Sequence, residues 1–326
     1  MTRPTTAALL QWGARRLRAG QVHFGHGALD AGEEASWLLS HVMRTNPGMP
    51  LPRVASPLQV ARYHALIDER IRLRRPVAYL LNEAWFAGRR FYVDERVLIP
   101  RSIIGEFILE RFAPWIRHPR RIRRVLDVGT GSGCIALALA RAFPLAQVHA
   151  SDISRDALAV AARNVHAQRL GGRVTLVHSD LFKGLRKHRY DLIVSNPPYV
   201  TGYEFRALPR EYRYEPKQAL VARARGLGAL LELLAKAPDH LTEGGILVLE
   251  TGNRAQTLSR MLPSVPFIWL TDSAGDGSVA LIDADALACS RGEIEARRRA
   301  LTGRKRAVPD KAPRLRRRSA VRSPGA

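Results

Sequence analysis

The sequence predicts an α/β fold in which an N-terminal helical domain precedes a doubly wound, mostly parallel seven-stranded sheet. From about residue 122 onward, short apolar runs alternate with stretches of helical periodicity, which is typical of parallel strands joined by helices. Before residue 82 the apolar residues recur only at helical spacing. Near the end, two apolar runs flank a glycine-rich turn, which predicts an antiparallel hairpin at the edge of the sheet.

Residues 1–82 are expected to form the small helical domain. Its first helix carries Leu9 and Trp12, its second covers about 33–43, and its third begins at Ser56-Pro57, an N-cap followed by proline at the first helical position. Arginines precede the first acidic residue, Asp30, as they do in transit peptides, but no small-residue cleavage site follows. A folded amphipathic helix is therefore the preferred interpretation.

Three further segments follow from the same patterning. Residues 83–100 are rich in β-formers around Gly88 and predict a β-hairpin linker. Residues 101–290 are expected to form the sheet domain, and residues 291–326 a helical start that continues into a disordered basic tail. The strands are expected at 125–128, 147–150, 174–178, 192–195, 246–250, 267–270 and 278–282, and helices at 135–143, 155–168 and 228–241.

Composition excludes several classes of protein. Hydrophobic residues make up 46% of the 326, so a sizeable core is available. The two cysteines, Cys134 and Cys289, cannot build a disulfide framework or a four-thiolate zinc site, and no metal site is expected. No apolar run is long enough to span a membrane, so we expect a cytoplasmic protein without membrane contact.

The chain is strongly basic. Its formal net charge is +23, of which the last 36 residues carry +10, so the other 290 residues still carry +13. Such a surface attracts polyanions, including nucleic acid and ribonucleoprotein. Arginine far outnumbers lysine, so codon bias is an equally good explanation of the charge on the body.

The strongest local pattern is a glycine-rich loop in the segment Val125-Leu-Asp-Val-Gly-Thr-Gly-Ser-Gly133. Glycine lets the backbone turn tightly and lets a ligand approach main-chain atoms. A dinucleotide fingerprint would need glycine at position 134, where the chain has Cys134, and the loop has no Lys or Arg to neutralise phosphates. The loop therefore predicts a nucleoside site without a pyrophosphate, with a plain structural turn as the alternative.

Two carboxylates follow the next two strands. Asp152 lies 19 residues past Gly133, where an acidic side chain can accept from both ribose hydroxyls, and Asp180 can accept from an adenine amino group. Each alone is more often a helix cap. Together they describe a pocket for adenosine carrying a cationic amino-acid tail, which is S-adenosylmethionine. Asp127 is expected near the ammonium of that tail, or to hold the loop in place.

A diproline corner, Ser195-Asn-Pro-Pro-Tyr199, follows the fourth predicted strand. The two prolines fix φ and remove two amide donors, and Asn196 is pushed towards an extended conformation. The corner can present the Asn196 side-chain oxygen and the Pro197 carbonyl as acceptors, with Tyr199 as an aromatic wall. Accepting both hydrogens of a planar –NH2 group directs its lone pair out of the plane, so neither a metal nor a covalent nucleophile is needed. A structural turn is the alternative.

The glycine loop and the diproline corner together resemble the class I S-adenosylmethionine-dependent methyltransferases that modify planar amino nitrogens, whose fold is Rossmann-like. That group acts on adenine of DNA, guanine of ribosomal RNA, or glutamine amides. Segments outside the sheet resemble the glutamine methyltransferases, and the resemblance covers about residues 5–290. These segments are Arg75-Pro-Val-Ala-Tyr-Leu80 with Phe86, Val97-Leu-Ile-Pro-Arg-Ser102 with Glu106, and Leu208-Pro-x-Glu-Tyr-Arg213 with Glu215-Pro216.

Two bacterial branches of that family differ at the segment that here reads Pro100-Arg-Ser-Ile-Ile-Gly-Glu106. The peptide-release-factor branch usually reads Pro-Arg-Pro-Asp-Thr-Glu. This segment, Phe24-Gly-His-Gly27 and the Trp12 helix are similar to the other branch, whose members methylate a glutamine of large-subunit ribosomal protein L3. The chain departs from the family at Arg225, where aspartate is usual, and in its basic tail.

The resemblance implies roles for individual residues. Asn196, Pro197, Pro198 and Tyr199 would form the catalytic corner, with Asn196, Pro197 and Tyr199 holding the glutamine amide. The helical domain and Arg101 would grip the protein substrate, whereas His26 and Cys134 are expected to be structural. The S-adenosylmethionine contacts would be Asp127, Gly129, Thr130, Gly131, Ser132, Gly133, Asp152, Asp180, Leu181 and Asn196.

Three other functions stay open at this stage. The chain could methylate release factors, it could methylate an amino nitrogen of nucleic acid, or it could be a non-catalytic ribosome-binding module. The basic tail is expected to contact ribosomal RNA through phosphates. The sequence leaves the oligomeric state undetermined.

Overall fold

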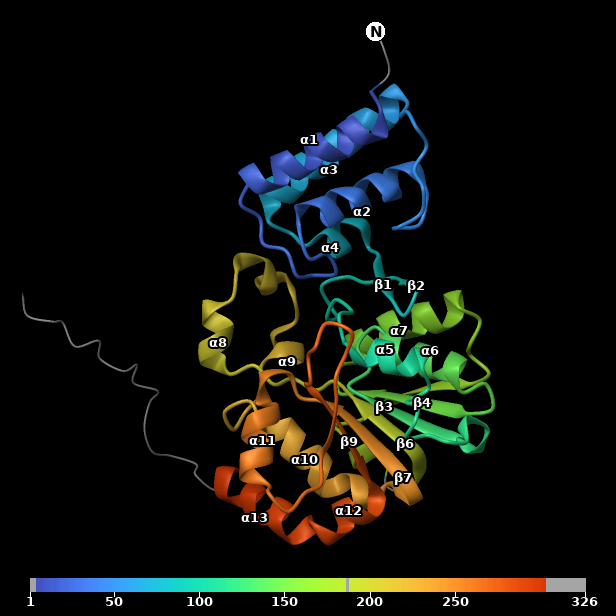
Figure 1. The fold of residues 1–326 in the computed structure, drawn as a ribbon, viewed down its shortest axis with the longest axis vertical. Coiled ribbons are helices and arrows are strands. Elements are labelled where there is room, and N and C mark those ends of the chain that lie inside the picture. The colour runs from blue at the N-terminus through green and yellow to red at the C-terminus, as the bar shows by residue number, and fades with distance from the viewer. Residues whose placement is uncertain (1–3, 186–187, 303–326) are drawn as a thin grey trace, which may run out of the picture.

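The computed structural model describes residues 4–185 and 188–302. A helical unit stands at the N-terminal end, a small hairpin follows it, and a seven-stranded sheet with helices on both faces forms the larger part (Figure 1). The predicted fold class is confirmed. Among the described residues, no helix is both long and apolar enough to cross a membrane.

The N-terminal unit consists of four helices, and the first three begin after a residue whose side chain caps the helix. Asp30 accepts from the backbone amides of Gly32 and Glu33, and Ser56 forms a capping box with Gln59. Leu17, Leu38, Tyr63 and Ile67 are fully buried between the helices. The helices are α1 Thr6–Ala19, α2 Ala31–Met43, α3 Pro57–Leu73 and α4 Val77–Leu81.

The predicted linker is a two-stranded hairpin, β1 Ala84–Phe86 and β2 Arg89–Phe91. Its turn residues Ala87 and Gly88 have φ values of 46° and 69°, which lie in the left-handed region. The hairpin lies between the helical unit and the sheet domain (Figure 1).

The sheet has the strand order β5-β4-β3-β6-β7-β9-β8, and only β9 runs antiparallel to its neighbours. The order reverses between β3 and β6, so the carboxyl ends of these strands form the crevice where doubly wound folds bind ligands. The strands are β3 Arg124–Val128, β4 Gln147–Asp152, β5 Val174–His178, β6 Tyr190–Ser195, β7 Leu241–Glu250, β8 Ile268–Leu270 and β9 Val279–Asp283.

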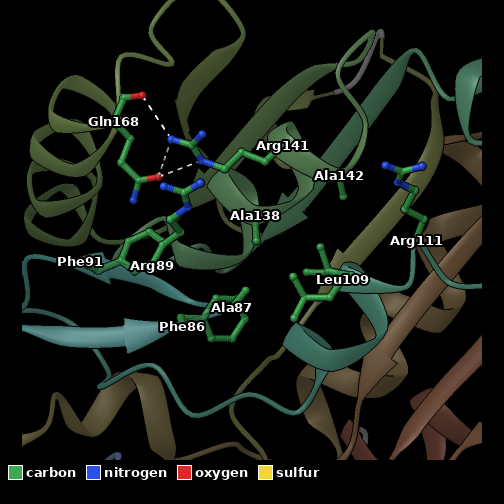
Figure 2. A pocket seen from close by; sticks show the side chains of 11 residues that line it. Phe86, Ala87, Arg89, Phe91, Leu109, Arg111, Ala138, Arg141, Ala142 and Gln168 are labelled. Atoms are coloured by element: carbon green, nitrogen blue, oxygen red, sulfur yellow. Dashed lines mark hydrogen bonds between the residues drawn. The ribbon is translucent and has the colours of Figure 1, made fainter. Parts of the chain in front are cut away.

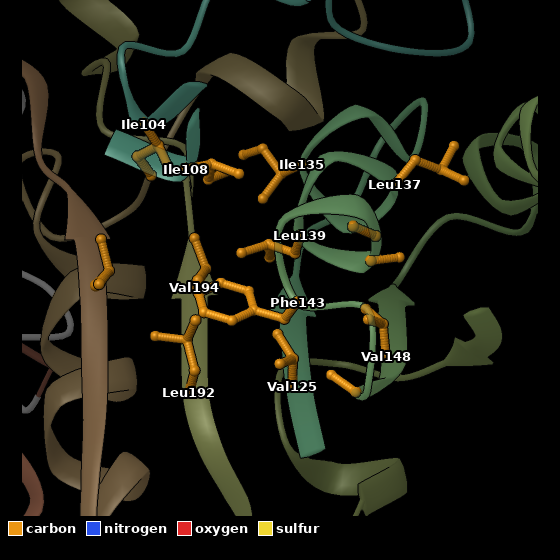
Figure 3. Packing of buried hydrophobic residues seen from close by; sticks show 14 of the residues in the cluster. Ile104, Ile108, Val125, Ile135, Leu137, Leu139, Phe143, Val148, Leu192 and Val194 are labelled. Carbon is orange, nitrogen blue, oxygen red and sulfur yellow. The ribbon is translucent and has the colours of Figure 1, made fainter. Parts of the chain in front are cut away.

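Helices bury both faces of the sheet. On one face, Ile108, Leu139 and Phe143 pack over Val125 and Val194 of the central strands (Figure 3). On the other face, leucines of α10 cover the opposite side of the same strands. The first face carries α5 Ile104–Leu109, α6 Cys134–Ala142 and α7 Arg155–Ala167, and the second carries α10 Gly228–Lys236, α11 Ala255–Met261, α12 Ala284–Cys289 and α13 Arg291–Thr302.

Helix α13 extends the folded chain beyond the boundary expected at residue 290. Ile294 is fully buried, and the Arg298 guanidinium lies 2.6 Å from the Glu232 carboxylate of α10. Residues 303–326, which hold most of the predicted tail, lie outside the described residues.

Candidate functional site

A cavity of about 290 Å³ lies at the carboxyl ends of β3, β4, β5 and β6, where the strand order reverses. Val97, Leu98 and Pro216 bound it from outside the sheet. Eight of the residues predicted for the site line it, although they come from four separate parts of the sequence. They are Gly129, Gly131, Asp152, Asp180, Leu181, Asn196, Pro197 and Pro198.

The glycine loop has one side towards the cavity and one towards the protein. Gly129 and Gly131 have φ values of 75° and 54°, and a Cβ at either position would meet no heavy atom within 4 Å apart from its chain neighbours. Gly133, with φ of 82°, instead lies against Ala161, 3.3 Å from where its Cβ would be. The first two glycines therefore keep the cavity open for a ligand, and the third serves helix packing.

Asp127 lies beneath this loop rather than on the cavity wall. Its side chain is fully buried, and one oxygen accepts from the Thr130 hydroxyl at 2.6 Å and from the Ala136 amide at 3.0 Å. The other oxygen has no hydrogen-bond partner among the described residues. Burial raises the pKa of Asp127 to about 7. Asp127 thus holds the loop shape from below, and Thr130 and Ser132 also lie off the cavity wall.

Asp152 joins the second strand to the glycine loop. Its carboxylate accepts from the Gly131 amide at 2.9 Å and from the Ser154 amide at 2.8 Å while it lines the cavity. Asp180 also lines the cavity, but its half-exposed carboxylate lies 2.5 Å from the Lys183 ammonium. A ligand that uses Asp180 therefore has to share it with Lys183.

The diproline corner follows β6 directly. The Ser195 hydroxyl donates to the Val128 carbonyl at 2.8 Å and ties the end of β6 to β3. Asn196, Pro197 and Pro198 border the cavity, and no described residue hydrogen-bonds the Asn196 side chain. The corner thus presents an unengaged amide oxygen within a rigid backbone.

Tyr199 lies behind the corner, not on the cavity wall. Its ring packs against Gly252, where a Cβ would collide with it, and its carbonyl accepts from the Arg254 guanidinium at 3.1 Å. Burial raises the pKa of Tyr199 to about 12, so the phenol stays neutral. The side chain therefore supports the corner from the protein side.

Comparison with known proteins decides the family. A family model of the methyltransferase small domain matches residues 107–211. The ribosomal protein uL3 glutamine methyltransferase of Bordetella pertussis is 42% identical over 286 residues, which covers 87% of this chain and 96% of the relative. The chain belongs to the uL3 glutamine methyltransferase family.

A second relative agrees with this assignment. The Francisella tularensis member of the family is 41% identical over 281 residues, covering 85% of this chain and 90% of its own. Among solved structures, a methyltransferase from Pyrococcus furiosus matches with a TM-score of 0.42 and 20% identity, over 59% of this chain and 87% of that chain. The identity to the two relatives confirms the resemblance to the L3 branch, which is protein uL3 in the relatives' names.

Arg101, expected to grip the substrate, is engaged within this methyltransferase itself. Its guanidinium makes two contacts with the Glu215 carboxylate, at 2.5 and 2.8 Å, and Glu215 also accepts from the Ile99 amide at 3.1 Å. Glu215 directly precedes Pro216 on the cavity wall. Arg101 therefore anchors the loop that borders the cavity, and it does not line the cavity.

Glu250, a buried carboxyl next to the corner, could not be recognised from the sequence. Glu250 ends β7, one residue past Leu249, which pairs with Ser195. It is 6% exposed and accepts from the Ser102 hydroxyl. Burial raises the pKa of Glu250 to about 7, although the Ser102 hydrogen bond and the Arg101 charge oppose that shift.

Replacing Glu250 by glutamine is expected to stabilise the fold of this methyltransferase at pH 8 and to have little effect at pH 5. Because its pKa is about 7 when folded and 4.5 when unfolded, the wild-type carboxyl favours the folded state below pH 4.5 and loses that advantage as the pH rises through 7. The gain at pH 8 amounts to about 3 kcal/mol at most.

Urea unfolding at both pH values measures this difference. Glu243→Gln is the matched control, because Glu243 is exposed on the same strand. An equal response of the two variants at both pH values would contradict the assigned pKa of Glu250.

A second set of residues missed by the sequence analysis joins the helical unit to the loop after the corner. Arg70 is fully buried, 2.7 Å from the Glu34 carboxylate and 3.6 Å from that of Glu211. Glu211 also accepts from the His23 amide at 2.9 Å. We call Glu34, Arg70 and Glu211 the interdomain triad. It fixes the helical unit relative to the loop that carries Glu215 and Pro216.

His26 lies beside this triad and has the structural role expected for it. It is 3% exposed, and its ring centroid lies 4.3 Å from that of Tyr212. Neither ring nitrogen has a hydrogen-bond partner among the described residues. Burial, followed by the charges of Arg101 and Arg70, lowers the pKa of His26 to about 3. The imidazole is therefore neutral and packs as an aromatic group.

Proposed function

We propose that this chain transfers a methyl group from S-adenosylmethionine to the side-chain amide nitrogen of a glutamine in ribosomal protein uL3. The observation that carries the proposal is the diproline corner: the unengaged Asn196 side chain borders the same cavity as the glycine loop and Asp152. An acceptor pair and a nucleoside-type pocket in one cavity suit transfer of a small group to a planar amide.

The residues present fit S-adenosylmethionine. A Cβ at Gly129 or Gly131 would occupy open space, so the glycines leave room for a ligand against the main chain. Asp152 offers a carboxylate where ribose hydroxyls are bound in such folds. Among the described residues that line the cavity, Arg96 is the one cation, and it is paired with Asp94 at 2.6 Å, which suits a ligand without phosphates.

S-adenosylmethionine, when bound, supplies an electrophilic methyl group on a sulfonium sulfur. We assign to the Asn196 side-chain oxygen and the Pro197 carbonyl the task of accepting the two hydrogens of the glutamine –NH2 group. Accepting both fixes the plane of the amide and directs the nitrogen lone pair out of it. The amide nitrogen would form the new bond to the methyl group while the sulfur–methyl bond breaks, so that S-adenosylhomocysteine is the leaving group and the nitrogen releases one proton to solvent. Orientation of this kind contributes on the order of 7–11 kcal/mol in related reactions.

The choice of uL3 rests on the relatives. Two members of the family, from Bordetella pertussis and Francisella tularensis, bear the name ribosomal protein uL3 glutamine methyltransferase, and each matches at least 85% of this chain. We infer the same substrate here, and the cytoplasm as the place of reaction, since a ribosomal protein is made there. A contact between the basic tail, residues 291–326, and ribosomal RNA stays part of the proposal, supported by the basic charge of that segment.

Incubating the purified chain with methyl-labelled S-adenosylmethionine and free uL3 is expected to label a single glutamine, which peptide mass spectrometry locates. Release factors and bulk RNA serve as competing substrates in the same assay. Label in a release factor but not in uL3 would assign the chain to the other branch. Label that nuclease removes and protease does not would identify a nucleic-acid methyltransferase.

A further inference from the structure

A second cavity, of about 270 Å³, lies away from the proposed site. It is bounded by the β1–β2 hairpin, the end of α5 and the C-terminal half of α6 (Figure 2). Its floor is apolar and includes Phe86, Ala87 and Ala138. Leu109 contributes a side chain that is 66% exposed. No residue of the proposed methyl-transfer site lines this cavity.

Three exposed arginines surround that floor. Arg89 belongs to β2, Arg111 follows α5, and Arg141 lies in the last turn of α6, so three separate parts of the chain bring them together (Figure 2). Among the described residues, the guanidinium groups of Arg89 and Arg111 make no hydrogen bond or ion pair, and the wall of the cavity contains no Asp or Glu. We call this set the arginine rim.

Arg141 is held by a neutral partner only. Its guanidinium donates to the Gln168 side-chain oxygen, with nitrogen–oxygen distances of 3.3 Å, and to the Gln168 carbonyl at 3.5 Å (Figure 2). Partial burial and then the charges of Arg89 and Arg173 lower the pKa of Arg141. The fold thus places three positive charges around the cavity without a negatively charged residue on its wall. This arrangement favours binding of an anionic ligand.

The backbone holds Arg111 in an uncommon conformation. Arg111 and Phe112 have consecutive φ values of 54° and 55°, a left-handed conformation that costs free energy in residues other than glycine. Phe112 is fully buried in the core, which keeps the segment in that conformation. The position of Arg111 at the cavity is therefore set by the core and not by a flexible loop.

We propose that this cavity binds single-stranded RNA, with phosphates on the arginine rim and a nucleobase over the apolar floor. Guanidinium groups suit phosphate oxygens, and an apolar floor can contact the face of any of the four nucleobases. The +13 charge of residues 1–290 favours an extended polyanion over a short acidic peptide. This RNA site is independent of the proposed methyl transfer.

Fluorescence anisotropy with a fluorescein-labelled single-stranded oligouridine, titrated at several salt concentrations, tests the proposal on the full chain. The double variant Arg89→Gln/Arg141→Gln is expected to bind more weakly. The slope of log K against log salt should become shallower by about 1.4, since each phosphate contact on a single strand contributes about 0.7.

The matched control is Arg72→Gln/Arg260→Gln, which removes the same charge from exposed positions on α3 and α11. It is expected to leave the slope close to that of the wild type. Equal changes in the two double variants would overturn the proposal, because the effect would then come from net charge alone. The same comparison in a chain ending at Thr302 shows whether the effect depends on residues 303–326.

A third variant tests the apolar floor without changing charge. Ala138→Leu should fill part of the cavity and weaken oligouridine binding several-fold while leaving the salt slope unchanged. Thermal unfolding and methyl transfer to free uL3 are measured for every variant, and both are expected to stay near wild type. Unchanged RNA binding together with lost binding of a labelled polyglutamate peptide would reject the RNA site in favour of a peptide site. Absent methyl transfer in all proteins would count against the proposed function only.

Discussion

Asn196→Ala is expected to lower the turnover number for methyl transfer to uL3 by about three orders of magnitude, equivalent to about 4 kcal/mol of lost transition-state stabilisation. The variant removes one of the two acceptors assigned to the glutamine –NH2 group, so the amide can rotate and its lone pair is no longer directed. The backbone of the corner should persist, because Pro197, Pro198 and the Ser195–Val128 hydrogen bond do not involve the altered side chain.

Single-turnover kinetics with labelled S-adenosylmethionine measure this loss, and calorimetry of S-adenosylhomocysteine shows whether cofactor binding persists. Asn253→Ala is the control, because Asn253 is an exposed asparagine close in sequence to Gly252 behind the corner. It is expected to transfer methyl groups at nearly the wild-type rate. Near-normal transfer by the Asn196 variant would refute the role given to the corner.

The sheet could be predicted from the sequence because buried parallel strands are short apolar runs separated by helices. The beginning of β7 was missed for a local reason. The strand starts at Leu241, but exposed residues and the pair Gly244-Gly245 interrupt its apolar pattern. The preceding helix α10 ends at Lys236, before Pro238, earlier than the predicted residue 241.

Helix α13 was harder to recognise than the strands. It is rich in charged residues, and Ile294 is the one fully buried position among residues 291–301, so its periodicity is weak. Its place in the fold depends on contacts with α10, such as the Arg298–Glu232 ion pair. No local sequence pattern predicts such contacts.

Part of the candidate site could be predicted from the sequence and part could not. The glycine loop and the diproline corner could be found because closely spaced glycine or proline residues determine their backbone conformation. The sequence could not show which residues of these two segments face the cavity. In the structure, Asp127 and Tyr199 face the protein interior and do not line the cavity. Glu250 with Ser102 and Arg101 with Glu215 are pairs separated by 148 and 114 residues. A single sequence carries no signal for such distant pairs.

Arg70→Met is expected to lower the free energy of unfolding by about 3–5 kcal/mol, because it leaves the buried Glu34 carboxylate without its cation and leaves Glu211 with Arg74 alone, 3.5 Å away. Arg70 is 0% exposed, and its guanidinium also donates to the His23 carbonyl at 2.7 Å. Burial already raises the pKa of Glu34 against the opposing charge of Arg70. Removing Arg70 raises the pKa of Glu34 further, so the variant loses more stability at pH 8 than at pH 5.

Chemical unfolding at the two pH values measures this loss, with Arg16→Met as the control. Arg16 lies on α1 and pairs with Asp68 of α3 at 2.8 Å, but both side chains are at least half exposed. Exposed pairs contribute about 0–1 kcal/mol, so this variant should remain near wild type at both pH values. The double variant Arg70→Met/Glu34→Met should recover part of the loss, because one unpaired buried carboxylate is then gone. A loss no greater than that of Arg16→Met would mean that the interdomain triad does not hold the helical unit to the loop beside the cavity.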